Sequence, residues 1–192
     1  MSEVRGEDWY GESLGAVQHR DVTFVEVDFT EATTSGASFD SCTFHNCRFN
    51  SSSHDTSAFI ACDFRRTSFF DATFVGCKLT GSTFDGCTMR PMRVEGGQWR
   101  GVNIRGANLT RLDLSGLDLR EADLSLSDLS HSDLSGAQLE GATVHHTKLH
   151  ETDLRGARLD GVDLSAALLS KTRLDLAGGV HLAELYGAIV EP

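Results

Sequence analysis

The feature that most constrains this chain is a five-residue period that runs through most of its 192 residues. From Phe24 to Leu174, every fifth residue is large and apolar, and Thr34 and His54 are the two exceptions. Phenylalanine dominates the first part of this column and leucine the second, and the register never slips. Self-similarity at a fixed period indicates a repeat architecture.

A second column, of small residues, lies two positions before the first. It contains alanine, serine, threonine, valine and all five cysteines, which are Cys42, Cys47, Cys62, Cys77 and Cys87. Residues two apart point to the same side of an extended segment. Glycine often follows two residues after the large one and tolerates the positive φ of a tight turn. Each pentapeptide is therefore predicted to be a short strand closed by a turn.

Five residues are too few for a useful helix or for a hairpin that buries two faces, so we expect the chain to coil. If each unit turns the chain by about a right angle, four units close a square, and the next coil stacks on it at roughly 4.8 Å. Both columns then fill the axis of a solenoid whose coils contact only their neighbours. About eight such coils would make a rod of roughly 37 Å. The period thus predicts an all-β solenoid.

We expect three parts along the chain: an N-terminal cap over 1–21, a β-helix over 22–175 and a C-terminal segment over 176–192. The repeat ends at Leu174, and Gly178-Gly179 are expected to break the chain. The residues beyond this break that follow the spacing of a short amphipathic α-helix are Leu182, Leu185, Tyr186, Ile189 and Val190. Such a helix can cap the last coil, form a homodimer interface, or do both.

Two departures from the pattern have structural interpretations. Thr34 and His54 are twenty residues apart, so they should stack on neighbouring coils, with water or hydroxyls such as those of Ser52 and Ser53 satisfying them. Over residues 88–99, two methionines, a proline and a Gly-Gly pair interrupt the repeat. We expect a bend or a changed turn type there, with Gly97 compensating for the volume of Trp99.

The net charge of −11 argues against direct binding to nucleic acid or to an anionic membrane, so electrostatic partners should be basic. The first twenty residues lack the apolar core of a signal peptide, and no apolar stretch is long enough to cross a membrane. Five cysteines without CxxC spacing suggest reduced thiols and a cytoplasmic protein. A Cys42–Cys62 disulfide is sterically conceivable and not expected.

No catalytic or cofactor-binding motif is present, and a filled rod offers no deep pocket, so we expect neither an enzyme nor a cofactor. Four histidines in outward turn positions are interpreted as solvated surface residues rather than metal ligands: His131, His145, His146 and His150. A third hypothesis places an enzymatic site at the N-terminal cap, around Trp9, His19 and Asp21.

Stretches such as Ala122-Asp123-Leu124-Ser125 and Ala107-Asn108-Leu109-Thr110 resemble the tandem motif of the pentapeptide-repeat proteins. That resemblance covers at least residues 22–174 and implies a right-handed quadrilateral β-helix, with the short C-terminal α-helix added here. Within the family, the chain is most similar to the mycobacterial MfpA-type fluoroquinolone-resistance proteins, which interact with DNA gyrase. The loops that generally interrupt the repeat of the related Qnr proteins are absent. The resemblance also implies a two-fold dimer joined at the C-terminal ends.

Aspartates precede successive central leucines, and some of them should form a ladder up one face. The residues assigned to this acidic, partner-binding face are Asp113, Asp118, Asp123, Asp128, Asp133 and Asp153. Aspartate at this position can also serve the turn, because its side chain can accept a hydrogen bond from the following backbone. On a rod of roughly 20 to 25 Å, near the width of a duplex, the acids suggest a DNA mimic that binds the basic DNA-binding surface of gyrase.

By the resemblance, the outcome is inhibition or modulation of gyrase and protection from fluoroquinolones. The alternative hypothesis is a rigid solenoid scaffold that binds another regulatory protein without mimicking DNA.

Overall fold

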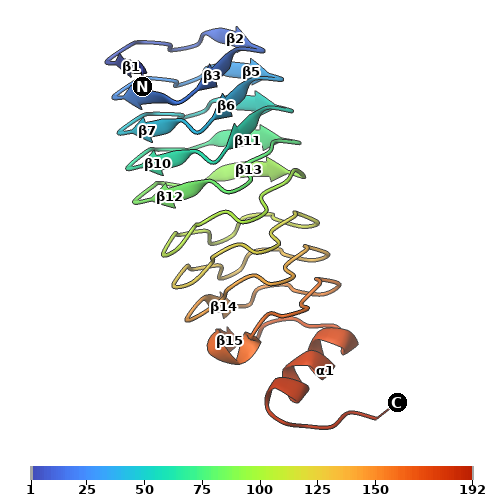
Figure 1. Ribbon diagram of the computed structural model, residues 1–192. Coiled ribbons are helices and arrows are strands. Elements are labelled where there is room, and N and C mark those ends of the chain that lie inside the picture. The colour runs from blue at the N-terminus through green and yellow to red at the C-terminus, as the bar shows by residue number, and fades with distance from the viewer. Residues whose placement is uncertain (1, 192) are drawn as a thin grey trace.

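The computed structural model describes residues 2–191, which form a parallel β-solenoid of about eight coils followed by one short helix (Figure 1). The predicted fold class is confirmed. Residues 1 and 192, the outer ends of the expected N-terminal cap and C-terminal segment, lie outside the described residues. Within 2–191, no helix is long and apolar enough to cross a membrane.

Each strand pairs in parallel with the strand twenty residues away, so the solenoid has four faces, named here after one strand of each. The β1 face consists of β1 (Ser2–Arg5), β4 (Val22–Val25), β7 (Thr43–His45), β10 (Asp63–Arg65) and β12 (Thr83–Asp85). The β2 face consists of β2 (Ser13–Gly15), β5 (Thr33–Ser35), β8 (Ser53–Asp55), β11 (Ala72–Val75) and β13 (Met92–Glu95). The β3 face consists of β3 (Gln18–Arg20), β6 (Ser38–Asp40) and β9 (Ala58–Ile60). The β14 face carries β14 (Lys148–His150) and β15 (Leu168–Ser170).

After β13 the same register continues largely as isolated bridges between neighbouring coils, for example between Asn103 and Asp123. The coils therefore stay stacked where the chain has few formal strands, as the thin lower coils of Figure 1 show.

The central column fills the axis of the solenoid with stacked side chains. The rings of Phe24, Phe44, Phe64 and Phe84 stack in succession, with centroids 4.9, 4.8 and 4.8 Å apart. These separations match the spacing of paired strands, because each ring stands on the coil below its neighbour. In the second part of the rod, leucines such as Leu124 and Leu134 occupy the same column and are buried.

The small column also links one coil to the next. Its hydroxyls and thiols donate to the carbonyl of a central residue 23 positions earlier: Ser127 Oγ to Ile104 O at 2.6 Å and Cys62 Sγ to Phe39 O at 3.3 Å. This contact explains why serine, threonine and cysteine share the column, since each is a compact donor. All five cysteines are free, and burial raises the pKa of Cys47 to about 11.

His54 is buried in a polar cluster within the otherwise apolar core. Its Nδ1 lies 2.8 Å from Thr34 Oγ1, and its Nε2 lies 3.0 Å from Ser52 Oγ. Ser52 donates to the carbonyl of Phe49, so its oxygen is left to accept from the imidazole. The stacking of Thr34 on His54 and the role of Ser52 are confirmed, while Ser57 Oγ, 2.9 Å from Thr34 Oγ1, completes the cluster instead of Ser53.

Acidification should destabilise the protein through His54. Burial lowers its pKa to about 3, from about 6.5 in an unfolded chain. The free energy of unfolding is therefore highest above pH 6.5, where the imidazole is neutral in both states. It falls by about 1.4 kcal/mol per pH unit as the pH is lowered from 6.5 toward 3. Between pH 7 and 4.5 we expect a loss of about 2 to 3 kcal/mol in the free energy of unfolding, measured by urea denaturation. His54→Leu should lack this loss; an equal loss in both proteins would contradict the assignment.

The sequence predicts a bend or a changed turn type over residues 88–99, and the structure has a changed turn there. At most corners the residue two after the central one has positive φ, but Pro91 occupies that position and follows a cis peptide bond from Arg90. A further positive φ of 113° occurs at Gly97. A Cβ there would meet Cys77 O at 2.4 Å, so the neighbouring coil's backbone, rather than the volume of Trp99, requires this glycine.

The C-terminal helix α1 (Leu176–Leu185) begins earlier than predicted and ends earlier. Gly178-Gly179 lie inside its first turns instead of breaking the chain, and a Cβ at Gly178 would come 3.0 Å from the Leu174 side chain. Asp175 caps the helix by accepting from Gly178 N. The helix contacts the 3-10 helix Leu164–Ala166 of the last coil, and Ile189 and Val190 follow it as irregular chain.

Candidate functional site: the charged surface and the C-terminal end

Three of the predicted aspartates form a ladder on one face. Asp113 pairs with Asp133, and Asp133 with Asp153, as bridges between successive coils. Their column continues the β2 face beyond β13, and corner glycines beside it, Gly116 and Gly136, add no charge. The C-terminal part of the β2 face is therefore a stripe of stacked carboxylates.

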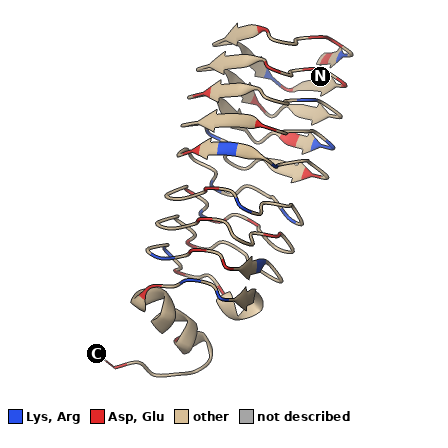
Figure 2. Ribbon diagram, turned by 180° about the vertical axis from the view of Figure 1, so that it is seen from behind, with Lys and Arg blue, Asp and Glu red and all other residues tan. Residues whose placement is uncertain are grey.

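The other three aspartates lie on the remaining faces of the rod. Bridges place Asp123 in the column of the β1 face, Asp118 in that of the β3 face and Asp128 opposite Lys148 of β14. The six residues thus surround the rod instead of forming a single patch. Figure 2 shows acidic and basic segments interspersed along the coils.

A hydrogen bond within each turn explains why aspartate recurs here. The side chain accepts from the backbone N–H two residues later, at 3.0 Å for Asp113 with Ser115 and 2.8 Å for Asp133 with Ser135. Asn103 makes the same contact with Arg105 N at 3.1 Å. The carboxylates thus have a structural origin, and an asparagine can replace one without loss of the turn.

The acids differ in how far neighbouring cations offset them. Arg120 holds Asp118 at 2.8 Å and keeps the pKa of that carboxyl below its usual range. A hydrogen bond from Arg155 lowers the pKa of Asp153 to about 2, and Lys148 lies 3.3 Å from Asp128. Asp123 lies 3.9 Å from Arg105 Nη1, whereas Asp113 and Asp133 form no ion pair within residues 2–191.

The sequence predictions did not include a second acidic region, which is the N-terminal end of the rod. Residues 2–31 contain eight acidic and two basic side chains, so they carry more than half of the net charge of −11. They form the first coil and part of the second, with β1 paired to β4. Counting charge coil by coil along the sequence would have found this concentration.

The C-terminal end presents apolar side chains to solvent. Of the five predicted dimerisation residues, Leu182 packs against the core, while Leu185, Tyr186, Ile189 and Val190 are exposed. Tyr186 is 73% and Ile189 90% exposed, and Leu176 at the start of α1 joins them at 85%. Leu176, Leu185, Tyr186, Ile189 and Val190 are here called the C-terminal patch, and nothing within residues 2–191 covers them.

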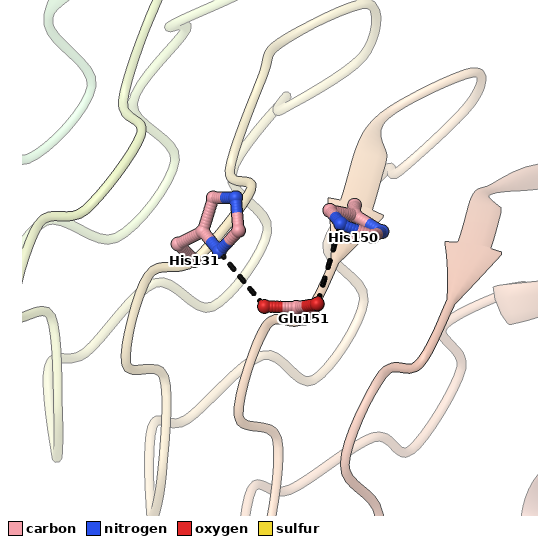
Figure 3. Close-up of side chains that lie close together, drawn as sticks. All are labelled: His131, His150 and Glu151. Atoms are coloured by element: carbon pink, nitrogen blue, oxygen red, sulfur yellow. Dashed lines mark ion pairs between the residues drawn. The ribbon is translucent and has the colours of Figure 1, made fainter.

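Two of the four histidines come together with an acid that the sequence predictions did not include. His131 Nδ1 lies 3.2 Å from Glu151 Oε2, and His150 Nε2 lies 3.6 Å from Glu151 Oε1 (Figure 3). The period of twenty residues explains the meeting, because His131 and Glu151 are corner residues of successive coils. His145 and His146 lie beside each other, with ring centroids 4.0 Å apart.

At the N-terminal end, His19 belongs to the aromatic stack. Its ring lies 5.3 Å from that of Phe39 and 6.1 Å from that of Trp9, and burial lowers its pKa. Asp21 is an exposed corner residue with positive φ. Within residues 2–191, no ion pair joins His19 to a carboxylate, so the acid and histidine cluster that an enzymatic site would require is not found there.

A family model of the pentapeptide repeats matches the chain in eight copies, over residues 57–90, 100–136 and 137–175. A comparison with curated proteins gave no match.

Solved structures of similar fold include QnrB1, a plasmid-mediated fluoroquinolone resistance protein. Its full-length form is 20% identical, with a TM-score of 0.54 over 97% of both chains. A trypsin-treated variant is 23% identical, with a TM-score of 0.56 over 99% of this chain and 98% of that one. HetL, involved in heterocyst differentiation regulation in the cyanobacterium Nostoc, is 19% identical, with a TM-score of 0.51 over 90% of this chain and 86% of HetL.

Proposed function

Because the chain belongs to the pentapeptide-repeat family, we propose that it acts through its outer surface. In this proposal it is a DNA mimic that occupies the basic DNA-binding surface of DNA gyrase. In this proposal the protein inhibits or modulates gyrase and protects it from fluoroquinolones. The observation that carries the proposal is the arrangement of acids around a filled rod: each aspartate is fixed by its turn, and the six surround the axis.

Charge and shape together favour a basic groove as the binding partner. Phosphates of a duplex carry one charge per about 1.7 Å of axis, and the rod, with a net −11 over about eight coils, is a diluted version of that field. This negative field extends along the axis, because the N-terminal coils are strongly acidic and Asp113 and Asp133 on the β2 face have no ion pair within residues 2–191. Complementary charges on two surfaces speed their association, and the attraction between them weakens as the salt concentration rises.

The fold likeness to QnrB1 supports this proposal, since that protein confers fluoroquinolone resistance. The fold likeness to HetL, which acts in regulation, supports the alternative, a scaffold that binds a regulatory protein without mimicking DNA.

A supercoiling assay tests the function directly. Added to purified gyrase and relaxed plasmid, the protein should reduce supercoiling in a dose-dependent way, and with a quinolone present it should reduce the cleaved complexes that the drug traps. Unchanged supercoiling and unchanged cleavage at saturating protein would contradict the proposal.

Charge variants separate mimicry from a scaffold role. Asp113→Asn with Asp133→Asn should weaken binding to gyrase, because the turns are kept and two unpaired charges are lost. Lys78→Gln with Arg111→Gln should strengthen it, since neither cation forms an ion pair within residues 2–191. If both double variants bind like the unaltered protein at every salt concentration, the scaffold alternative is favoured.

We further propose that two copies join at their C-terminal ends through the C-terminal patch. The exposed apolar side chains of this patch supply the contact area between the two copies. Such a dimer would double the rod and its charge, to −22.

Replacing Tyr186 and Ile189 by aspartate should convert the dimer to a monomer. Two charges on each side of an apolar interface would have to be desolvated without partners. Sedimentation equilibrium should then give the mass of one chain, 20.8 kDa. Leu126→Asp is the matched control, because Leu126 is also an exposed apolar residue, 49% accessible, but lies in the middle of the rod. A monomeric unaltered protein, or dimers of the Tyr186 and Ile189 variant, would disprove the interface.

A further inference from the structure

We propose that His131, His150 and Glu151 form a surface binding site for a divalent transition metal ion, with Zn²⁺ as the ion that the donor set fits best. The site links two successive coils near the C-terminal end of the rod. It contradicts our own sequence-based expectation that the histidines only contact solvent.

The ligand atoms are already near the distances that a metal requires. One nitrogen from each histidine and an oxygen of Glu151 all lie within 4.8 Å of one another. A tetrahedral Zn²⁺ with bonds of about 2.1 Å holds its ligands about 3.4 Å apart. The contacts of 3.2 Å and 3.6 Å to Glu151 are near that separation, but they reach the two different carboxylate oxygens, so a metal bound through one oxygen requires the side chains to rotate.

The backbone holds the three residues in a fixed relation. His131 N donates to His150 O at 2.8 Å, which fixes the first histidine against the second. Glu151 N donates to Ser170 O at 2.8 Å, so the acid is anchored to the following coil. A site on such a ladder is largely preorganised, and the two imidazoles with one carboxylate leave a coordination position for water or for a group from a partner.

Lys171 competes with the metal for Glu151. Its Nζ lies 3.2 Å from Glu151 Oε1, in the same corner column one coil further on. A bound cation would have to displace this ammonium or share the carboxylate with it. Removal of Lys171 should therefore strengthen metal binding, an effect that nonspecific attachment of zinc to surface histidines would not produce.

Calorimetric titration of the untagged, full-length protein with Zn²⁺ tests the site. We expect one ion per chain and an affinity at least about tenfold weaker in Glu151→Gln, His131→Asn and His150→Ser. These replacements suit the fold, because asparagine tolerates the positive φ of His131 and serine occupies positions 130 and 170 of the His150 column. Lys171→Met should bind more tightly, and Co²⁺ in place of Zn²⁺ should give the visible absorption of a tetrahedral complex.

His145→Ala with His146→Ala is the matched control, because this variant removes two neighbouring histidines with no change at the proposed site. It should bind Zn²⁺ like the unaltered protein. Absence of Zn²⁺ binding in the unaltered protein, equal binding in Glu151→Gln, or loss of binding in the His145 and His146 variant would each overturn the proposal.

Discussion

Replacing Phe44 by alanine should lower the free energy of unfolding by about 3 to 5 kcal/mol. The ring is fully buried and stacks 4.9 Å from Phe24 and 4.8 Å from Phe64. Its ring also makes edge contacts with the rings of Phe29, Phe39, Phe49 and Phe59. A cavity here cannot collapse easily, because the hydrogen-bonded coils hold the neighbouring rings at the strand spacing. Urea denaturation followed by circular dichroism would measure the loss.

Phe70→Ala is the matched control, since it makes the same change at a phenylalanine that is 51% exposed. Its effect should stay within about 0.5 kcal/mol. A similar loss in both variants would mean that the stacked column does not dominate the stability of the rod.

Replacing Gly97 by alanine should lower the free energy of unfolding by at least about 3 kcal/mol. A Cβ at this position would lie 2.4 Å from Cys77 O and 3.2 Å from Cys77 N, and its φ of 113° is one that residues with a side chain rarely adopt. The obstacle is the backbone of the neighbouring coil, so the two coils would have to separate. The urea midpoint of the variant would measure the effect.

Gly101→Ala provides the comparison, because Gly101 also has positive φ but a Cβ there would meet nothing within 4 Å. Gly101→Ala should lower the free energy of unfolding by about 1 to 2 kcal/mol, which is the cost of the left-handed conformation alone. If Gly97→Ala lowered the free energy of unfolding no more than Gly101→Ala does, the two coils would not approach each other closely near residue 97.

The fold was predictable because the five-residue period specifies which side chains point inward, and packing then leaves few solutions. The start of α1 was not, because the position of the Leu174 side chain under Gly178 depends on how the last coil ends. A Gly-Gly pair is typical of a helix break, but here Gly178 lies in close contact with Leu174, while a Cβ at Gly179 would meet nothing within 4 Å.

The candidate site was predictable only in part. The period places Asp113 beside Asp133, but it does not tell which acids find a cation, since Asp118 is paired by Arg120 from its own turn. Pairs such as Arg100 with Glu121 depend on side-chain rotamers across coils. His131 and Glu151 are exactly one coil apart, and a search for ligand pairs at a separation of twenty residues would have found them.

The central claim is that the rod takes the place of DNA on gyrase, and competition for the enzyme tests it most directly. Gyrase holoenzyme would be loaded with a fluorescent duplex, and the anisotropy followed as the protein is added at several salt concentrations. The proposal predicts complete displacement of the duplex, with an apparent affinity that falls as salt rises and falls further for the Asp113→Asn, Asp133→Asn variant. A ternary complex of gyrase, duplex and protein, or no displacement at any salt concentration, would contradict it.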